Sequence, residues 1–517
     1  MSQEIEIRFA AHPDDLTRLA RGGALSGVAV GRATTRRMST IYYDTKDLGF
    51  AKAGLALRVR KIGRRHVQTV KNENSGNFAS ERDEYECPLP SAEPDLRFVP
   101  DAGVRERLQA IANDTELSPV IETDISRTTR VLTTDSGDEV ELAVDRGEIR
   151  TFANGHAALP VSEVELELKH GQTSVLYDLA RQLSRETSLT VASESKAERG
   201  LRALEGREIS TYKAGRTALS SDATAEDAFR ATLAHCLKHI TRNVSAVVEA
   251  RDPEGVHQIR VALRRLRVAL STFGPSFRVA AIVELSARAK NLSDIFGDTR
   301  ELDVFAGELL QPIEEAAKKP GLPQLRLILE ALRRESWEGA VALVRSDDFT
   351  GFVLELASAI ETRIWRGVAA PEQLGELLRP ARELARETLD AKLKRACKRA
   401  KHLSSLNAEE RHRLRIALKK LRYTAEFFAP LFPAKAVSAF LMRLSKLQDL
   451  FGALNDAATS EHILRRVTEH AGSNGTPELL EAAAFVEGWH QSRIGPTWDN
   501  AKKRWKKFTK TEPFWAA

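Results

Sequence analysis

Cysteine is scarce in this sequence, and the few cysteines lie far apart. The chain of 517 residues contains only Cys87, Cys236 and Cys397. An odd number of widely separated cysteines excludes a disulfide framework and a cysteine-rich metal knuckle. The sequence therefore predicts a protein of the reducing cytoplasm.

Long apolar runs are also missing. No stretch approaches the ~18 consecutive apolar residues of a membrane-spanning helix, so no membrane partner is expected. We expect no signal peptide either, because an alternating strand pattern begins already at residue 4.

A large excess of one charge is the third absence. Lysine and arginine together number 78, against 72 aspartates and glutamates, for a net charge of +6. In a nearly balanced chain the positions of the basic residues matter more than their total. Local basic clusters in the second half indicate an anionic partner held at defined places.

Two kinds of periodicity divide the chain. Residues 1–205 contain many short segments of period two, with helical patches between them, and predict a β-rich α+β domain. From residue 222 to 517 the period is helical throughout, which predicts an all-α bundle. Residues 206–221 have no strong period and are rich in Gly, Ser and Thr, so we expect a linker there.

The helical part contains an internal repeat. VHQIRVALRRLRVALSTFGP (256–275) matches RHRLRIALKKLRYTAEFFAP (411–430) position by position, and His257 and His412 are 155 residues apart. Further on, LSDIFGDTRELDVF (292–305) is echoed by LSKLQDLFGALNDAA (444–458). The pattern predicts two copies of one helical unit.

Each copy of the repeat has a basic stripe along one face of its helix. The stripes are His257, Arg260, Arg264 and Arg267 in the first copy, and His412, Arg415, Lys419 and Arg422 in the second. A solvated basic face is the alternative for either helix alone. However, no acidic residue at i±4 relieves the repulsion, and the pattern occurs twice. Two such helices side by side would form a channel for phosphate oxygens. Nucleic acid is disfavoured, because no aromatic residues are interleaved for stacking on bases.

These motifs resemble the CHAD domain over about 222–517. The resemblance lies in the HxxRVxxRRLR run, its second copy HxxRIxxKKLRY, and the FGxxRELD and FGALND turns. It implies an all-α bundle with a two-fold internal repeat that binds inorganic polyphosphate through the eight stripe residues. Asp303 and Asp456, in matching turns, are expected to orient basic side chains.

Charged and apolar residues alternate on the N-terminal strands, as in EIEIRF (4–9), LRVRK (57–61) and EVELEL (163–168). For one strand, an ordinary half-exposed sheet is the simpler interpretation. Across the set, carboxylates bunch on some strands and guanidiniums on others, which favours a closed barrel with its charged face inward. Carboxylate rows would require Mg²⁺ or Mn²⁺, and basic rows would hold phosphate. Together they would form a phosphoryl-transfer site.

The N-terminal motifs resemble the CYTH domain, the triphosphate tunnel metalloenzymes, over 1–205. EIEIRF stands where that family has ExExK. The other matching segments are YYDT (42–45), LRVRK (57–61), TVK (69–71), RDEYE (82–86), DRGEI (145–149), EVELEL (163–168) and SKAERG (195–200). A CYTH domain followed by a CHAD domain is similar to inorganic triphosphatases, and the resemblance implies an antiparallel β-tunnel.

The CYTH resemblance also implies roles for individual residues. The metal ligands would be Glu4, Glu6, Asp145, Glu163 and Glu165; the phosphate-binding residues would be Arg58, Arg60, Lys71, Arg130 and Lys196; and Glu4, Glu6, Arg8 and Lys71 would be catalytic. Arg127 is an alternative to Arg130 within SRTTR. Arg8 replaces the usual lysine, and its planar fork reaches differently from an ammonium group.

The function implied is hydrolysis of inorganic triphosphate to pyrophosphate and phosphate with Mg²⁺ or Mn²⁺, by in-line attack of a metal-activated water. The C-terminal domain would bind polyphosphate, and the protein would associate with polyphosphate granules. One alternative is a non-catalytic protein that binds polyphosphate or is targeted to granules. A class IV-type adenylate cyclase is less favoured because of the fused helical domain.

Overall fold

The structure is a computed structural model that describes residues 2–22, 25–72, 78, 80–113, 115–152, 158–274, 279–367, 371–472 and 475–516. The side chains of residues 2–4, 80–82 and 371–373 also lie outside the description. The chain forms two compact units: the first is Met1–Tyr212, Ile240–Arg251 and Leu343–Arg363, and the second is Lys213–His239, Asp252–Ala342 and Ile364–Ala517. Residues 207–220, within the predicted linker, contain no helix or strand.

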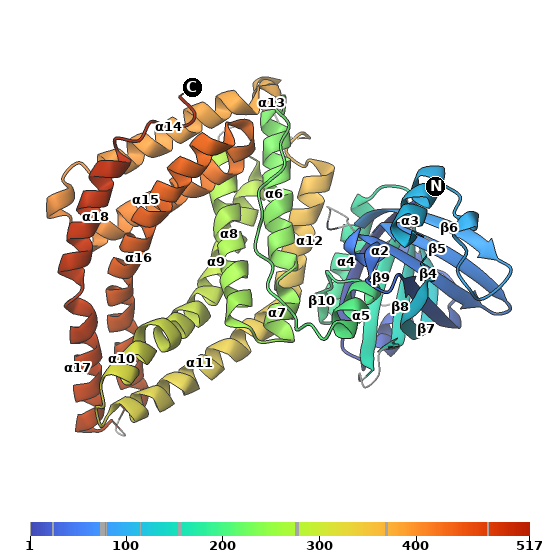
Figure 1. Cartoon of the computed structure of the whole chain (residues 1–517), viewed down its shortest axis with the longest axis horizontal. Helices are drawn as coiled ribbons and strands as arrows, with labels where there is room; N and C mark the ends of the chain where they lie inside the picture. The colour runs from blue at the N-terminus through green and yellow to red at the C-terminus, as the bar shows by residue number, and fades with distance from the viewer. Residues whose placement is uncertain are drawn as a thin grey trace. The chain divides into compact units, whose positions relative to one another are not determined.

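An antiparallel sheet that closes on itself forms the centre of the first unit (Figure 1). Its strands are β1 (Ser2–Ala11), β2 (Val28–Val30), β3 (Thr34–Asp44), β4 (Leu55–Ile62), β5 (Arg65–Asn72), β6 (Ser80–Leu89), β7 (Ser118–Thr134), β8 (Glu139–Thr151), β9 (Leu159–His170) and β10 (Leu189–Val191). The order is β1-β6-β5-β4-β3-β7-β8-β9, and β9 returns to pair with β1. The predicted antiparallel tunnel is confirmed.

Strand β1 closes the ring by pairing on both of its edges. Residues Ser2–Glu6 pair with β6, and Glu6–Ala10 pair with β9. Because successive side chains point to opposite faces of a strand, Glu6 and Arg8 face one way and Ile7 and Phe9 the other. Ile7 and Phe9 are fully buried in the core outside the ring, and burial of each stabilises the fold by roughly 1.5–3 kcal/mol. This burial fixes the register that turns the charged residues inward.

Short helices cover the outside of the closed sheet. They are α1 (Leu16–Leu19), α2 (Gly49–Lys52), η1 (Leu96–Phe98), α3 (Ala102–Ala112), α4 (Ser174–Glu186) and α5 (Lys196–Leu204). Phe50 of α2 and Leu108 of α3 pack with the strand residues Leu57 and Val70. Two later segments, α7 (Val244–Val248) and α12 (Asp347–Thr362), belong to this unit as well. The hydroxyl of Thr350 in α12 donates to the Leu189 carbonyl at 2.6 Å.

Among the described residues of the second unit, all the named elements are helices (Figure 1). Its helices are α6 (Ala225–Thr241), α8 (Pro253–Phe273), α9 (Ala280–Val304), the π-helix η2 (Phe305–Leu310), α10 (Gln311–Ala316), α11 (Leu322–Val344), α13 (Pro371–Leu378), α14 (Ala381–Arg399), η3 (Leu403–Ser405), α15 (Ala408–Phe428), η4 (Ala429–Leu431), α16 (Ala434–Ala471), α17 (Pro477–Gln491) and α18 (Ile494–Phe508). The predicted all-α domain is confirmed. Within the described residues, every helix is too short or too polar to span a bilayer.

The two sequence repeats form equivalent helix pairs, α8 with α9 and α15 with α16. The register of 155 residues continues into the second helix of each pair, since Phe296 and Phe451 are also 155 apart. Ile259 and Leu263 of α8, like Leu414 and Leu418 of α15, are completely buried. These apolar faces point into the bundle, and the basic stripes lie beside them.

Candidate functional site

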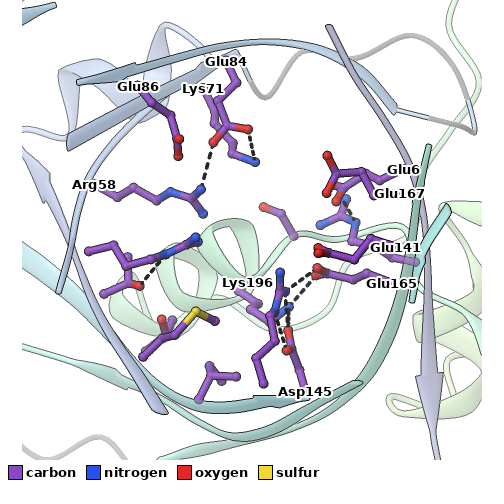
Figure 2. A pocket seen from close by; sticks show the side chains of 18 of the residues that line it. Glu6, Arg58, Lys71, Glu84, Glu86, Glu141, Asp145, Glu165, Glu167 and Lys196 are labelled. Carbon is purple, nitrogen blue, oxygen red and sulfur yellow. Dashed lines mark hydrogen bonds and ion pairs between the residues drawn. The ribbon is translucent and has the colours of Figure 1, made fainter. Parts of the chain in front are cut away.

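A cavity of about 340 Å³ lies inside the closed sheet (Figure 2). All eight strands of the ring and the start of α5 contribute to its lining. Its charged lining residues are Glu6, Arg8, Arg58, Arg60, Lys71, Glu84, Glu86, Arg127, Glu141, Asp145, Glu165, Glu167, Lys169 and Lys196. Such a lining suits a small, highly charged ligand rather than an apolar one.

One side of the cavity holds a basic cluster balanced by a shared carboxylate. Arg58 and Lys71 both pair with Glu84, at 3.0 and 3.1 Å. The guanidinium of Arg60 lies next to that of Arg58, and this repulsion, together with burial, lowers the pKa of Arg60 to about 10. The cluster therefore has more positive charge than its own acids neutralise closely, which favours an anion there.

The opposite side of the cavity is acidic. Figure 2 shows Glu6, Glu141, Glu165 and Glu167 on this side, across from Arg58, Lys71, Glu84 and Glu86. Arg8 Nε lies 3.6 Å from Glu6 Oε1, so the residue at the usual lysine position pairs with its neighbour on the same strand. Lys169 pairs with Glu167 at 2.6 Å.

At one end of the cavity, Lys196 connects three carboxylates. Its Nζ lies 2.9 Å from Asp145, 2.7 Å from Glu163 and 2.7 Å from Glu165. Burial opposes the charge of Lys196, but the three carboxylates outweigh it and raise the pKa of this lysine. Arg127 adds a two-pronged contact to Asp145, at 2.7 and 2.6 Å, and also contacts Glu165.

A capping box at the start of α5 positions this lysine. The Ser195 hydroxyl accepts from the Glu198 backbone N–H at 3.1 Å, and the Glu198 carboxylate accepts from the Ser195 N–H at 2.7 Å. Such a reciprocal pair fixes where a helix begins. Lys196 is the first residue of α5, so the box holds its side chain over the cavity.

The acidic side has the chemistry of a Mg²⁺ or Mn²⁺ site. Glu6, Glu141 and Glu167 offer only carboxylate oxygens, the donors that these hard cations prefer. Among the described residues, no group of three or more His, Cys, Asp or Glu side chains is already arranged around one metal position. The side chain of Glu4, a predicted ligand on the same strand face as Glu6, lies outside the described residues. The donor types therefore fit the predicted metal.

Two predicted site residues lie elsewhere than expected. Arg130 does not line the cavity: its guanidinium donates to the carbonyls of Ala20 and Gly31, at 2.6 and 2.7 Å. Arg127, the alternative, points inward, so assigning Arg130 to the tunnel was wrong. Glu163 also lies behind the lining, where one oxygen contacts Lys196 and the other Arg199.

The remaining predicted tunnel residues whose side chains are described line one cavity. These are Glu6, Arg8, Arg58, Arg60, Lys71, Asp145, Glu165 and Lys196. The site predictions missed Glu141, Glu167 and Lys169. Glu141 and Glu167 pair directly across β8 and β9, and their alternation with apolar residues could have placed them on the inner face.

A second candidate site lies in the helical unit, where basic residues from both repeats meet. Arg260 and Arg264 of α8 act electrostatically on Arg415 and Lys419 of α15, and each lowers the pKa of the α15 residues. Arg260 has a nearby acid, Glu301, at 3.0 Å. Basic residues of α8 and α15 are thus close enough to repel one another, and the channel that they would form stays a prediction.

Unrelieved charge shifts the protonation of this cluster. Burial, followed by repulsion from Arg264, Arg415 and Arg260, lowers the pKa of Lys419 to about 6. Burial and the nearby Arg300 lower the pKa of His257 to about 4. At neutral pH both side chains therefore lack a proton, and an anion would favour its return.

The other stripe residues have different neighbours. Arg422 donates to Glu426 at 2.8 Å and to Gln448 at 3.1 Å. Glu426 lies four residues after Arg422, so the expectation that no acid at i±4 relieves the stripes is wrong for this residue. Arg267 acts on Lys420 together with Arg395 and Arg399 of α14. His412 is exposed at the start of α15. The predicted stripes are thus divided between a central cluster, formed by Arg260, Arg264, Arg415 and Lys419, and its surroundings. The basic residues of α14 were missed.

Asp303 and Asp456 do not play matching roles. Asp303 Oδ1 accepts from Arg333 at 2.8 and 3.1 Å and from Trp337 at 3.2 Å. Asp456 lies near Arg415, and burial raises its pKa to about 6. The register of 155 explains the difference, because it aligns Asp456 with Glu301 rather than with Asp303.

Asp303→Ala is expected to destabilise the helical unit without weakening polyphosphate binding. The change removes a buried acceptor of Arg333 and Trp337, and breaking such a pair costs about 3 kcal/mol. Thermal unfolding should show a melting temperature several degrees lower, whereas Asp294→Ala, at an exposed site on the same helix, should leave it unchanged. A loss of polyphosphate binding without a loss of stability would instead indicate a role in the ligand site.

Two protein families match separate parts of the chain. The CYTH domain family matches residues 2–201, and the CHAD domain family matches residues 231–465. The chain joins a CYTH domain to a CHAD domain. The tunnel cavity belongs to the CYTH domain, and the basic cluster of α8 and α15 belongs to the CHAD domain.

Three similar proteins define how far the likeness extends. An inorganic triphosphatase of Haemophilus influenzae is 30% identical over 204 residues, which are 39% of this chain and 54% of that protein, so the match spans about half of that relative. An uncharacterized protein of Mycobacterium tuberculosis is 24% identical over 86% of this chain and 85% of its own length. The crystal structure of the CHAD domain from Ricinus communis is 28% identical, with a TM-score of 0.50, and covers 57% of this chain and 96% of that one.

Proposed function

We propose that the CYTH domain hydrolyses inorganic triphosphate to pyrophosphate and phosphate, and that the CHAD domain binds inorganic polyphosphate. The observation that carries the first part is the division of the tunnel into a basic and an acidic side. It is supported by the triphosphatase of Haemophilus influenzae, whose similarity falls on the CYTH domain. In the proposed reaction, water adds to a terminal phosphorus and the bridging P–O bond breaks.

The basic side would bind the substrate and stabilise its leaving group. Arg58, Arg60 and Lys71 present their N–H groups to phosphate oxygens, and a phosphate would take the place of Glu84 as their partner. The same three cations would stabilise the negative charge that develops on pyrophosphate as the bond breaks. Their positions on adjacent strands β4 and β5 preorganise them for this task.

The acidic side would hold the divalent cation on which CYTH enzymes generally depend. Glu6, Glu141 and Glu167 are the described residues suited to it, and Glu4 joins them by its position on β1. A bound Mg²⁺ or Mn²⁺ would supply Lewis-acid stabilisation and lower the pKa of a coordinated water. Arg8, next to Glu6, would orient this carboxylate and add a positive charge facing the substrate.

Polyphosphate binding by the CHAD domain rests on the central cluster. The guanidinium groups of Arg260, Arg264 and Arg415 repel one another, and the nearby acids are too few to cancel this repulsion. A chain of phosphates would relieve it. Association with polyphosphate granules would follow from this binding. Both parts of the proposal therefore rest on phosphate chemistry.

The test is a substrate panel with the purified full-length protein. We expect phosphate release from triphosphate with Mg²⁺ or Mn²⁺, little from ATP, thiamine triphosphate or long-chain polyphosphate, and none after EDTA. Ion chromatography of the products should show equal amounts of pyrophosphate and phosphate. Formation of cyclic AMP from ATP, with triphosphate left intact, would contradict the proposal.

A specific observation supports a second candidate, a tunnel that binds phosphate without turnover. Asp145 and Glu165 are engaged by Lys196 and Arg127, so these carboxylates already have cationic partners. Under this alternative, triphosphate would bind tightly and remain intact with every divalent metal. Calorimetry with triphosphate beside the hydrolysis assay separates the two functions.

A further inference from the structure

A second cavity, of about 270 Å³, lies between the start of α15 and the middle of α16 in the CHAD domain. Its apolar lining includes Phe451, Leu454 and Ala458. His412 and Asn455 form a polar edge, and Arg415 lines the cavity as well. Arg415 also belongs to the central basic cluster, so the cavity adjoins the proposed phosphate site.

Among the described residues of the first repeat, the side chains at two equivalent positions are polar and already engaged. The positions equivalent to Leu454 and Ala458 are Thr299 and Asp303, 155 residues earlier. Thr299 bonds to the Ser336 hydroxyl at 2.8 Å, and Asp303 binds Arg333 and Trp337. Helix α11 therefore satisfies these positions in the first repeat. The second repeat presents small or apolar side chains instead, and their surface borders the cavity.

The polar edge of the cavity suits an uncharged group with hydrogen-bonding atoms. His412 Nδ1 lies 2.8 Å from Asn455 Oδ1. Since that amide oxygen only accepts, Nδ1 is the donor, and Nε2 of the neutral ring is an acceptor. The two charged lining residues beside this edge already have partners, since Glu409 pairs with Arg413 at 3.0 Å and the Arg411 guanidinium lies over the Trp498 ring. A ligand that fits these features has a neutral group with N–H donors in the cavity and its anionic part at Arg415.

We propose that this cavity binds the base of a nucleoside polyphosphate whose phosphates lie on the basic cluster. A planar base has the apolar faces for Leu454 and Ala458, and an exocyclic amine can donate to His412 or Glu409. The phosphates extend toward Arg415 and from there to Arg264 and Lys419. The phosphate half of this arrangement rests on the proposed polyphosphate site, whereas the base half rests on the cavity alone.

Photolabelling of the full-length protein with 8-azido-ATP in EDTA tests the proposal. Mass spectrometry should find labelled peptides from residues 408–458, and excess long-chain polyphosphate should compete with the label. Ala458→Phe fills the cavity from an exposed helix position and should reduce labelling of these peptides about tenfold. Ala453→Phe, exposed on the same helix but outside the lining, is the matched control and should leave labelling unchanged.

The outcomes separate this inference from the polyphosphate proposal. Label confined to the tunnel strands, or label on α15 and α16 that Ala458→Phe leaves unchanged, overturns the nucleotide site. Polyphosphate that binds the wild type and Ala458→Phe equally, together with loss of label in Ala458→Phe alone, supports it. If polyphosphate fails to bind while the label still depends on Ala458, the base site stands and the polyphosphate proposal fails.

Discussion

Glu6→Gln is expected to lower triphosphate turnover by at least about 100-fold. Glu6 is 6% exposed and faces the acidic side of the tunnel, next to Arg8. The amide keeps the size of the side chain but removes the negative charge that would hold Mg²⁺ or Mn²⁺. The loss should therefore appear in kcat, and the melting temperature should change little.

Metal dependence provides the sharper readout for this variant. If Glu6 helps to hold the cation, raising the Mn²⁺ concentration should recover part of the activity of Glu6→Gln. Glu106→Gln, an exposed change on α3 outside the tunnel, is the control and should retain full activity. Undiminished turnover in Glu6→Gln would exclude the acidic side as the catalytic wall.

Arg58 provides an independent check on the division of the tunnel. Removing the Arg58 side chain should weaken binding of triphosphate without changing the metal requirement, because Arg58 lies across the cavity from Glu6 (Figure 2). A variant of the acidic side should change the metal requirement and leave triphosphate binding unchanged. The two sides thus make separate contributions that the same kinetic data can distinguish.

The sequence predicted the closed sheet and its inward charges because burial marks one face of most strands. In EIEIRF the apolar residues Ile7 and Phe9 identify the outer face, so Glu6 and Arg8 must face inward. In SRTTR no apolar residue marks either face, and Arg127 and Arg130, three positions apart, point to opposite sides of β7. Only the pairing of β7 with its neighbours resolves which arginine enters the tunnel.

The sequence also did not predict which partner each inner-face residue meets along the length of its strand. Alternation places Glu163, Glu165 and Glu167 on one face, but it does not say that α5 covers the end near Glu163 with Lys196 and Arg199. The basic stripes have the same limit. A stripe of ten residues extends about 15 Å along a helix, so its two ends can meet different partners, as Arg260 and Arg267 do.

Lys419→Met is expected to weaken polyphosphate binding by about tenfold while raising the stability of the CHAD domain. The side chain keeps its length and apolar stem, so packing is retained. What disappears is an amine that loses its proton on folding, because burial and repulsion from Arg264, Arg415 and Arg260 lower the pKa of Lys419 to about 6. A gain of 1 kcal/mol would raise the melting temperature by about 2–4 °C.

The direction of the pH dependence follows from the same shift. Lysine titrates near 10.4 in the unfolded chain, so between about pH 6 and 10 the unfolded state binds more protons than the folded state, and the stability contributed by this group rises with pH. Bound polyphosphate would favour protonated Lys419, so binding at pH 7.5 should take up a proton and weaken as the pH rises. Asp456, with its pKa near 6, would add to the uptake at lower pH.

Calorimetry in buffers of different ionisation enthalpy measures this uptake directly. The wild type should take up a proton at pH 7.5, and Lys419→Met should take up less and show a flatter dependence of affinity on pH. Lys435→Met, an exposed change on α16, should match the wild type in affinity, uptake and stability. If Lys419→Met bound polyphosphate as the wild type does, the ligand would lie away from the α8–α15 cluster. If it were instead less stable than the wild type, the unrelieved repulsion on which the site rests would be absent.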